Sequence, residues 1–541
     1  MVVTPNSRVI LLKSPLKLDK YNQITFSSKA GQLNYFTSLP KIEEWNYTYI
    51  RKDGVIRAET DDNLTFEDLL EYNYCMYQNT HYDNKWFYAF VTDVTYINDG
   101  MTELKIETDV FQSWQFDIQY KNSFVEREHV SDDTIGAHTL PEQLETGEFV
   151  CNGIGNLWTQ GKECWVGAMV TVIPDGLSVN TFHVRYGGVF SGGCIIVFQD
   201  YLSACNFTRA YDLVDKPEAI TSIFMIPKSL CGEIEFTLCG MTKGNHTINF
   251  MAGVPAYTDQ ETLLSTVNVT YPASLNGYVP KNNKLWTFPY NYFYVSNTVG
   301  SDVDFHYEDF VNNAPSFKTI GTLTIGASIR AVPMNYKKLS DTNSSFNHFN
   351  CGVAGAKYPV CGWTNDSFTN WLTEQSVNHT MNMVGSAVGI VGGTALALTG
   401  VGVTAGVGLA AGGVASIIQT LKDIHQHSLV PPQTRGNTNT GDVAFASGSF
   451  EFPFYKMSIR YEYAKVIDDY FTMYGYKVNA LKTPNIHKRS NWDYIKTIDV
   501  NLEGDIPEKD MDAIRELFNN GCTFWHTTTH YLDYSRTNSI L

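Results

Sequence analysis

The side chains of this sequence that could do chemistry are carboxylates, histidines and cysteines. Glu126, Glu128 and His129 fall in a segment where apolar and polar residues alternate, and His425 and His427 lie two positions apart. On a helix, that separation puts the two imidazoles on different sides, so they make a poor metal pair and solvated histidines are favoured. The alternation around Glu126 favours a cross-strand charge pair over an acid–base catalyst.

Motifs with catalytic spacing do not accompany these side chains. The sequence lacks GxSxG, a P-loop, HExxH and an EF-hand loop. Many carboxylates are present and a pair could serve glycoside hydrolysis, but no spacing selects one. We therefore predict that the chain is not an enzyme and that it has no catalytic residue, cofactor or metal.

The ten cysteines do not indicate a disulfide framework, because none forms a CxxC pair and their number is low for the length. Cys231/Cys239 and Cys351/Cys361 are each spaced so that they could bridge a hairpin. The first residues contain no apolar core of signal-peptide length, which predicts a protein made in the cytosol. Free thiols are the favoured state there.

The uncharged stretch 380–421 is the informative feature of the sequence. It contains no Asp, Glu, Lys or Arg, in a chain whose net charge is -17. Its glycines recur at four-residue spacing, as in Gly385/Gly389 and Gly402/Gly406. Each glycine costs a helix about 1 kcal/mol relative to alanine, whereas the same small residues let helices approach closely in lipid. The stretch is therefore a poor helix in water and a suitable one in a membrane.

A helical hairpin fits this stretch better than one long helix. The arms, about 384–398 and 402–418, flank Thr399-Gly400 and are slightly shorter than the ~20 residues that cross a bilayer. Such a length favours insertion on demand over a permanent anchor, and burial inside an oligomer is the alternative left open. The residues predicted to be membrane-active are Met383, Val384, Gly385, Gly389, Ile390, Val391, Gly393, Leu396, Leu398, Gly400, Val403, Gly406, Leu409, Gly412, Val414, Ile417 and Ile418.

The rest of the chain is typical of a mainly β protein with a few short helices. Its 32 tyrosines and 31 phenylalanines favour strands, and 541 residues exceed one core. Alternating runs predict strands at 8–12, 85–94, 102–107 and 124–130, with Asp99-Gly100 as a hairpin turn.

Three helices are predicted from capping signals and apolar periodicity. The first is 65–76, capped by Thr65, and the second is 464–474, ended by Gly475. The third begins with Asp505 as its cap and ends at Gly521, and one of its faces carries Met511, Ile514, Leu517 and Phe518. A last short strand follows at 522–526.

Several short motifs near the two chain ends occur in a specific order. They are 84–91 (NKWFYAFV), 108–114 (TDVFQSW), 127–130 (REHV), 431–433 (PPQ), 474–479 (YGYKVN) and 519–526 (NNGCTFWH). In this order they resemble the distal tail knob protein of small short-tailed phages of the Picovirinae/Salasmaviridae type. The likeness covers about 1–130 and 430–541, whereas 131–375 does not match closely.

The resemblance implies a homohexameric, β-rich tube at the distal tip of the virion tail. It implies tube-wall β-barrel domains at 1–130 and 431–541, the latter with two helices, and an inserted β-rich distal domain at 131–375. The long hydrophobic loop, 376–430, would plug the lumen and then leave it to form a pore in the host cell membrane. The balance of 39 basic to 56 acidic residues suits a wall that DNA must pass without binding.

The partners implied by the resemblance are other copies of the chain, an upstream tail tube or lower collar protein, the host membrane and passing phage DNA. A tail-tip peptidoglycan hydrolase is a further possible partner. Two alternatives stay open. The chain could be a purely structural tail adaptor whose apolar hairpin only mediates assembly, or a tail protein that binds a receptor or degrades cell-wall glycan.

Overall fold

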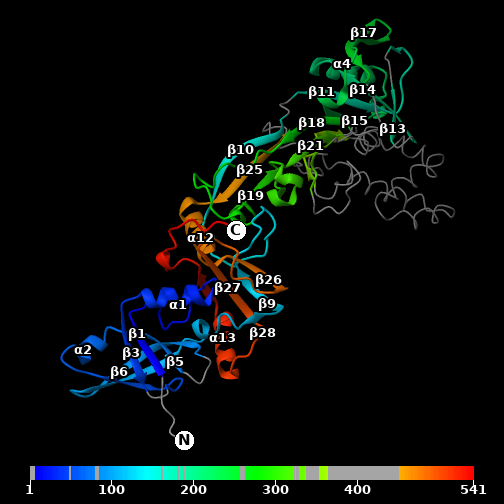
Figure 1. Ribbon diagram of the computed structural model, residues 1–541. Coiled ribbons are helices and arrows are strands. Elements are labelled where there is room, and N and C mark those ends of the chain that lie inside the picture. The colour runs from blue at the N-terminus through cyan, green and yellow to red at the C-terminus, as the bar shows by residue number, and fades with distance from the viewer. Residues whose placement is uncertain are drawn as a thin grey trace, which may run out of the picture. The chain divides into compact units, whose positions relative to one another are not determined.

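The computed structural model forms two compact units, in which both ends of the chain belong to the same unit (Figure 1). The first unit contains Met1–Val150, Ala273–Asn291 and Ser458–Leu541, and the second contains Cys151–Pro272 and Tyr292–Met457. The residues that the structure describes are 7–47, 50–79, 84–159, 163–178, 182–186, 189–255, 262–321, 323, 328–336, 352–362 and 450–541.

A six-stranded sheet in the first unit carries an apolar core on each face. Its order is β3-β1-β5-β6-β7-β4. Val9 and Leu11 of β1 enter one core and Ile10 and Leu12 the other, because successive residues of a strand point to opposite faces. The strands are β1 (Ser7–Leu12), β3 (Lys41–Tyr47), β4 (Val55–Glu59), β5 (Tyr74–Asn79), β6 (Trp86–Asn98) and β7 (Met101–Thr108).

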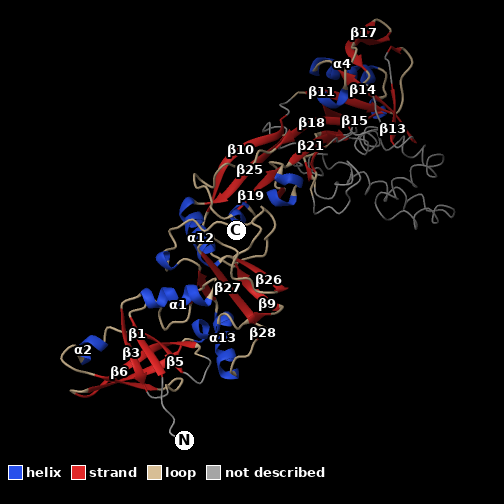
Figure 2. Ribbon diagram, in the orientation of Figure 1, coloured by secondary structure: helices blue, strands red, loops and turns tan. Residues whose placement is uncertain are grey.

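A five-stranded sheet in the same unit combines strands from the two chain ends, in the order β2-β29-β27-β9-β26. Figure 2 shows its strands β27, β9 and β26. The first strand, β2, runs parallel to the last one, β29, and pairs Ile24 with Trp525. The strands are β2 (Asn22–Ile24), β9 (Ser123–Glu128), β26 (Tyr476–Lys482), β27 (Trp492–Asp499) and β29 (Cys522–Trp525), with β8 (Gln119–Tyr120) and β28 (Leu502–Glu503) as a separate pair.

The helices of the first unit are short. Met511, Ile514, Leu517 and Phe518 of α13 are buried in one core, as their helical spacing predicts. The helices are α1 (Lys29–Ser38), α2 (Phe66–Leu69), α3 (Val110–Trp114), α12 (Tyr461–Tyr474) and α13 (Glu508–Asn520), with 3-10 turns η2 (Asn283–Trp286) and η7 (Thr528–His530).

The second unit contains an eight-stranded sheet, in which β12-β16-β17-β14-β11-β15-β24 form a path and β13 pairs with β14. Helix α4 packs on this sheet through Phe207, which contacts Phe198 and Phe250. The strands are β11 (Cys164–Val170), β12 (Leu177–Ser178), β13 (Phe182–Tyr186), β14 (Val189–Phe198), β15 (Ile220–Pro227), β16 (Thr237–Lys243), β17 (His246–Gly253) and β24 (Val360–Gly362), and the helices are α4 (Tyr201–Leu213), η1 (Pro217–Ala219) and α5 (Lys228–Cys231).

Two four-stranded sheets share an aromatic core in the second unit. Phe293, Phe305, Phe317 and Phe452 are all buried in it. One sheet has the order β10-β25-β19-β20 and the other β18-β21-β22-β23. Their elements are β10 (Phe149–Thr159), β18 (Thr262–Asn268), β19 (Asn291–Ser296), β20 (Asp302–Phe305), η3 (Tyr307–Asp309), η4 (Val311–Asn313), β21 (Ser316–Gly321), β22 (Ile329–Met334), β23 (Val353–Ala354) and β25 (Glu451–Ile459).

The predicted mainly β fold with a few short helices is confirmed, and so is the Asp99-Gly100 turn between β6 and β7. Gly475 ends α12 with a φ of 62°, as expected of a glycine cap. The helix predicted at 65–76 is wrong beyond its first turn. Thr65 caps α2, but Tyr74–Asn79 is a strand, because its buried side chains pack in the middle of the six-stranded sheet.

Asp505 is not the helix cap that the sequence predicts. Pro507 occupies the cap position of α13, and no side chain caps the helix there. The eight cysteines whose side chains the structure describes are free thiols, including Cys231 and Cys239, so no disulfide joins this pair. Cys351 lies outside the described residues, and with it the second proposed pair.

A fully buried carboxylate, that of Glu142, connects distant segments of the first unit. The side chain of Glu142 is 0% exposed and pairs with Arg127 and Lys284. It also accepts a hydrogen bond of 2.9 Å from the N–H of Lys477. A carboxylate without water is stable only when it is paired and hydrogen-bonded. The pairing of Glu142 therefore requires four separate segments of the chain to meet.

Replacement of Glu142 by Gln should lower the free energy of unfolding by about 3–5 kcal/mol, because Arg127 and Lys284 would keep buried charges without a partner. Denaturant unfolding of the intact protein measures this loss. Glu148→Gln is the matched control: Glu148 pairs with Arg460 at 3.1 Å, but its side chain is 79% exposed. An equal loss of unfolding free energy in both variants would show that the burial of Glu142 is not the cause of the effect.

Candidate functional site

The residues predicted to be membrane-active, 383–418, lie outside the described residues, as do His425 and His427. Their assignment stays a prediction. Among the helices that the structure describes, none combines the length and the apolar character needed to cross a membrane. The described ranges also contain no group of three or more His, Cys, Asp or Glu side chains that could hold a metal ion.

The cross-strand charge pair predicted for the segment around Glu126 is confirmed. Glu126 of β9 lies 2.8 Å from the ammonium group of Lys496 on the neighbouring strand β27. The next carboxylate, Glu128, is fully buried and pairs with Lys482 and Lys488. These acids are therefore held by cations of the same unit and are not arranged as a catalytic pair.

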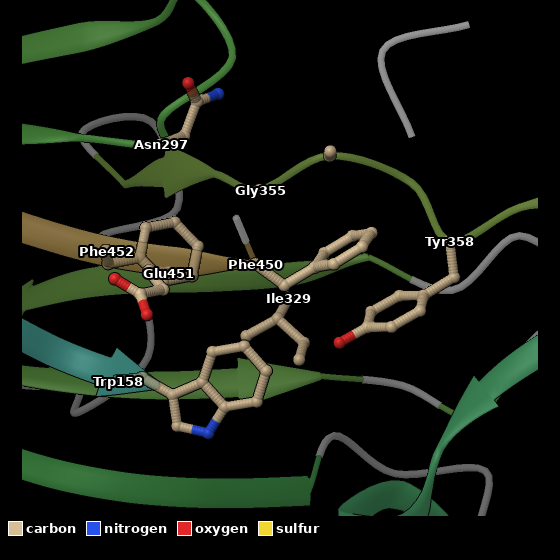
Figure 3. Close-up of a pocket in the computed structure, with 9 residues that line it drawn as sticks. Trp158, Asn297, Ile329, Gly355, Tyr358, Phe450, Glu451 and Phe452 are labelled. Carbon is tan, nitrogen blue, oxygen red and sulfur yellow. The ribbon is translucent and has the colours of Figure 1, made fainter. Parts of the chain in front are cut away.

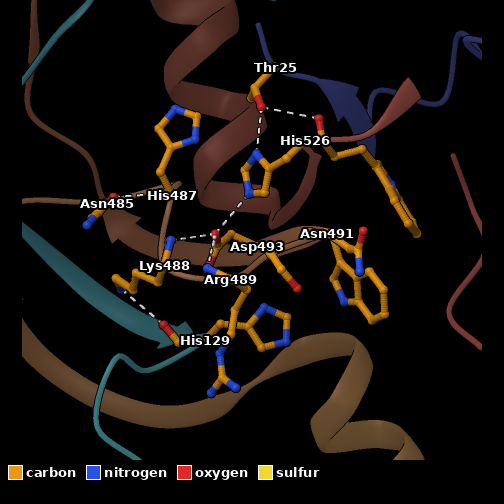
Figure 4. Close-up of polar contacts among 12 residues, drawn as sticks. Thr25, His129, Asn485, His487, Lys488, Arg489, Asn491, Asp493 and His526 are labelled. Carbon is orange, nitrogen blue, oxygen red and sulfur yellow. Dashed lines mark hydrogen bonds and ion pairs between the residues drawn. The ribbon is translucent and has the colours of Figure 1, made fainter. Parts of the chain in front are cut away.

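Asp493 is the centre of a buried polar cluster in the first unit (Figure 4). Its Oδ2 accepts hydrogen bonds from the N–H groups of Lys488 at 2.7 Å and Arg489 at 3.1 Å. The Nε2 of His526 lies 3.0 Å away from the same oxygen. Burial by itself would raise the pKa of Asp493, but the bond from His526 and the two backbone donors lower it overall.

His129 lies beside Asp493 and is held in one neutral tautomer (Figure 4). Its Nδ1 accepts a hydrogen bond of 2.8 Å from the N–H of Tyr494, so the proton is on Nε2. Nε2 then donates to the carbonyl of Thr472 at 3.1 Å. Burial lowers the pKa of His129 to about 4, because an imidazolium ion there would lose hydration and the bond from Tyr494.

Thr25, His526 and Asp493 form a line that has the residue types of a nucleophile–base–acid triad. The Thr25 hydroxyl lies 2.8 Å from Nδ1 of His526. However, Thr25 is 5% exposed, and its hydroxyl and its N–H both point at the carbonyl of Trp525, at 3.2 and 2.8 Å. The line therefore connects the residue that follows β2 and the residue that follows β29 with β27. No local sequence motif could reveal it, because Thr25 is 501 positions from His526 and Asp493 is 33 positions from His526.

A pocket of about 150 Å³ lies beside Thr25 in the first unit. Its wall contains Phe26, Phe116, Tyr120 and Ile486. Asp and Glu are absent from its lining, so it cannot supply the carboxylate pair of a glycosidase.

A second cavity lies in the aromatic core of the second unit, between Trp158, Tyr358 and Phe450 (Figure 3). Its volume is about 10 Å³, and the rings of Tyr358 and Phe450 stack at 4.2 Å beside it. Such a volume holds about one water molecule at most. This cavity is a packing feature and not a ligand site.

Acid should destabilise the first unit through His129. Its pKa is about 4 when folded and about 6.5 when unfolded, so below pH 6.5 the unfolded chain binds a proton that the folded chain does not. The contribution of His129 to the free energy of unfolding is therefore complete above pH 6.5. It falls by ~3 kcal/mol in all as the pH drops through 4. Denaturant unfolding at pH 7.5 and pH 5 measures the part of this loss that falls between the two pH values.

His129→Leu should remove this part of the acid dependence, while lowering stability at pH 7.5 because Tyr494 and Thr472 lose a partner. His530→Leu, which replaces a half-buried histidine of the same unit, is the matched control. An undiminished acid dependence in His129→Leu would show that other groups cause it.

Comparisons with known proteins place the chain among phage tail proteins. The family described as "Bacillus phage phi29, Tail knob protein gp9, C-terminal domain" matches residues 254–539. The family described as "Caudoviral major tail protein N-terminus" matches residues 5–121. Tail knob protein gp9 of Bacillus phage PZA is 25% identical over 96% of both chains, and that of Bacillus phage B103 is 25% identical over 97% of both.

A solved structure, the tail knob protein gp12 of bacteriophage C1, is similar in fold. Its TM-score is 0.60 at 14% identity, over 99% of this chain and 100% of that chain. Tail knob proteins are structural proteins of the virion tail that associate with other tail components, which agrees with the prediction of a non-enzymatic role. With more than half of its residues matched by that family, this chain belongs to the tail knob protein gp9 family of phi29-type phages.

Proposed function

We propose that six copies of this chain form a tube at the distal tip of the tail, through which phage DNA leaves the particle. The observation that carries the proposal is the uncharged, glycine-rich stretch 380–421 in a protein of the tail knob family. An element of this kind has to be kept from water, by burial among copies of the chain or by lipid.

The loop 376–430 has two environments in this proposal. Before ejection, six loops fill the lumen and bury one another. On triggering, they leave the tube, enter the host cell membrane as helical hairpins and line a pore. The four-residue glycine spacing supports the second state, because it allows close helix packing in lipid. A switch of this type requires contacts that differ between the tube and the membrane.

The remaining segments form the wall of the tube and its outer part, and other proteins hold the tube and prepare its path. Residues 1–130 and 431–541 form the tube wall, and 131–375 form the outer, distal part. The upstream tail tube or lower collar protein holds the tube, and a peptidoglycan hydrolase opens the cell wall ahead of it. The net charge of -17 supports passage of DNA, because a largely acidic surface does not retain phosphates.

Deletion of residues 384–418 should abolish pore formation. The intact protein is expected to release dye from liposomes, at neutral or mildly acidic pH, and the shortened protein is not. The physical reason is that the deletion removes both uncharged arms of the hairpin. The ring should still assemble, which is measured by the mass of the particle in solution.

The same experiment separates the proposal from the alternatives. An intact protein that never permeabilises liposomes would exclude the pore and favour a purely structural adaptor. Loss of the ring after the deletion would make the stretch a structural core. Turnover of purified wall polysaccharide would indicate a glycan-degrading role, and saturable binding of it without turnover would indicate an adhesin.

Single glycines should matter for the pore and not for the ring. Gly389→Leu or Gly406→Leu should reduce dye release on the order of tenfold, because the larger side chain separates helices that pack in lipid. Gly389→Ala is the matched control and should keep dye release, since alanine is also small. If the leucine variants fail to form rings, the glycines serve assembly instead.

A further inference from the structure

Asparagine is followed directly by glycine at three places in the sequence, which are Asn152-Gly153, Asn276-Gly277 and Asn520-Gly521. An asparagine in this position can lose ammonia without an enzyme, because the backbone nitrogen of glycine is not shielded by a side chain and can attack the neighbouring side-chain amide. The reaction needs a backbone that can rotate and a glycine nitrogen that is not held in a hydrogen bond. The structure therefore decides which pair can react.

Two of the three pairs are restrained by their surroundings. Asn152 and Gly153 lie inside β10, which pairs with β25, so their backbone is extended and fixed in a sheet. Gly521 follows the last residue of α13, and its N–H donates to the carbonyl of Phe518 at 3.2 Å. The hydroxyl of Tyr494 occupies the space in which a Cβ of Gly521 would lie. A reaction at either pair would have to break these contacts.

Asn276 and Gly277 are the two central residues of a tight turn in the first unit. The N–H and carbonyl of Leu275 exchange hydrogen bonds of 2.7 and 2.9 Å with the carbonyl and N–H of Tyr278. The φ angles of 48° and 88° at the central residues are typical of a type I′ turn. Within the described part of the chain, the backbone groups of these two residues make no hydrogen bond. The peptide group between them can therefore rotate while the turn stays closed.

Solvent can reach the nitrogen of Gly277. Both central residues of the turn are exposed, and a Cβ at Gly277 would meet no other atom within 4 Å. Access matters because the nitrogen becomes a nucleophile only after a base from solvent has removed its proton. Asn276-Gly277 thus meets both requirements of the reaction, whereas the other two pairs do not.

We propose that Asn276 is the site at which this protein deamidates. The deprotonated nitrogen of Gly277 forms a bond to Cγ of Asn276, and the bond from Cγ to Nδ2 breaks. Nδ2 takes up a proton from water and leaves as ammonia, so that a cyclic imide remains. Water then opens the imide at one of its two carbonyl carbons. Opening at Cγ gives aspartate, and opening at the backbone carbon gives isoaspartate, in which the chain continues through Cγ.

Each product changes the start of α12. Oδ1 of Asn276 lies 3.5 Å from the backbone nitrogen of Tyr461, the first residue of α12, and the cap residue Arg460 makes no side-chain capping bond. Aspartate would add a negative charge at this helix N-terminus, where that sign of charge is favourable. Isoaspartate would lengthen the backbone of the turn, so the two bonds between Leu275 and Tyr278 could not both be kept. The inference rests on this turn and is independent of the pore.

The test follows all three pairs in the intact protein during storage at neutral and at mildly alkaline pH. Samples are digested at acidic pH, where the imide forms slowly, and mass spectrometry measures the conversion of amide to acid in each peptide. Conversion at Asn276 should be about tenfold faster than at Asn152 or Asn520, which corresponds to roughly 1.4 kcal/mol in the barrier. The rate should rise with pH, because the proton of Gly277 is lost first.

Asn276→Gln is the variant that should stop this conversion, since glutamine would have to close a larger ring that forms more slowly. The ammonia released during storage should fall accordingly. Asn520→Gln is the matched control and should release ammonia like the unchanged protein. Thermal unfolding of both variants is measured, so that a change in rate caused by misfolding is recognised.

The two products have equal mass and are separated by chromatography. The isoaspartate form should unfold at a lower temperature than Asn276→Asp, because only isoaspartate lengthens the turn. Absence of conversion at Asn276, or equal rates at the three pairs, would overturn the proposal. An isoaspartate form that unfolds like Asn276→Asp would overturn the effect assigned to the turn.

Discussion

Pairing of buried carboxylates is the constraint on which the first unit depends. Glu128 and Glu142 have side chains without exposed surface, and each is held by two cations. These cations come from the segments around positions 127, 284, 482 and 488. An unpaired charge in such a place is strongly unfavourable. The unit is therefore complete only when the chain has left it, returned for Ala273–Asn291 and returned again for Ser458–Leu541.

This constraint separates what the sequence could predict from what it could not. Local patterns were sufficient for the Asp99-Gly100 turn and for the buried face of α13, because both follow from neighbouring residues. The sequence predicts helix as far as Met76, whereas Tyr74 already begins the strand Tyr74–Asn79, since the conformation there is decided by the neighbours β1 and β6. The line of Thr25, His526 and Asp493 depends wholly on contacts between distant segments. For 383–418, composition and spacing remain the basis of the assignment.

The proposed plug and the wall differ in their charged side chains, and these decide whether a segment can enter lipid. The described part of the proposed wall, within 1–130 and 431–541, contains the buried ions Glu128 and Lys488 and a neutral histidine whose hydrogen bonds depend on the surrounding strands. Moving such groups into hydrocarbon would be very unfavourable. The stretch 380–421 has no charged side chain to carry across. In the proposed mechanism, only the uncharged loop changes its environment, and the wall keeps its fold.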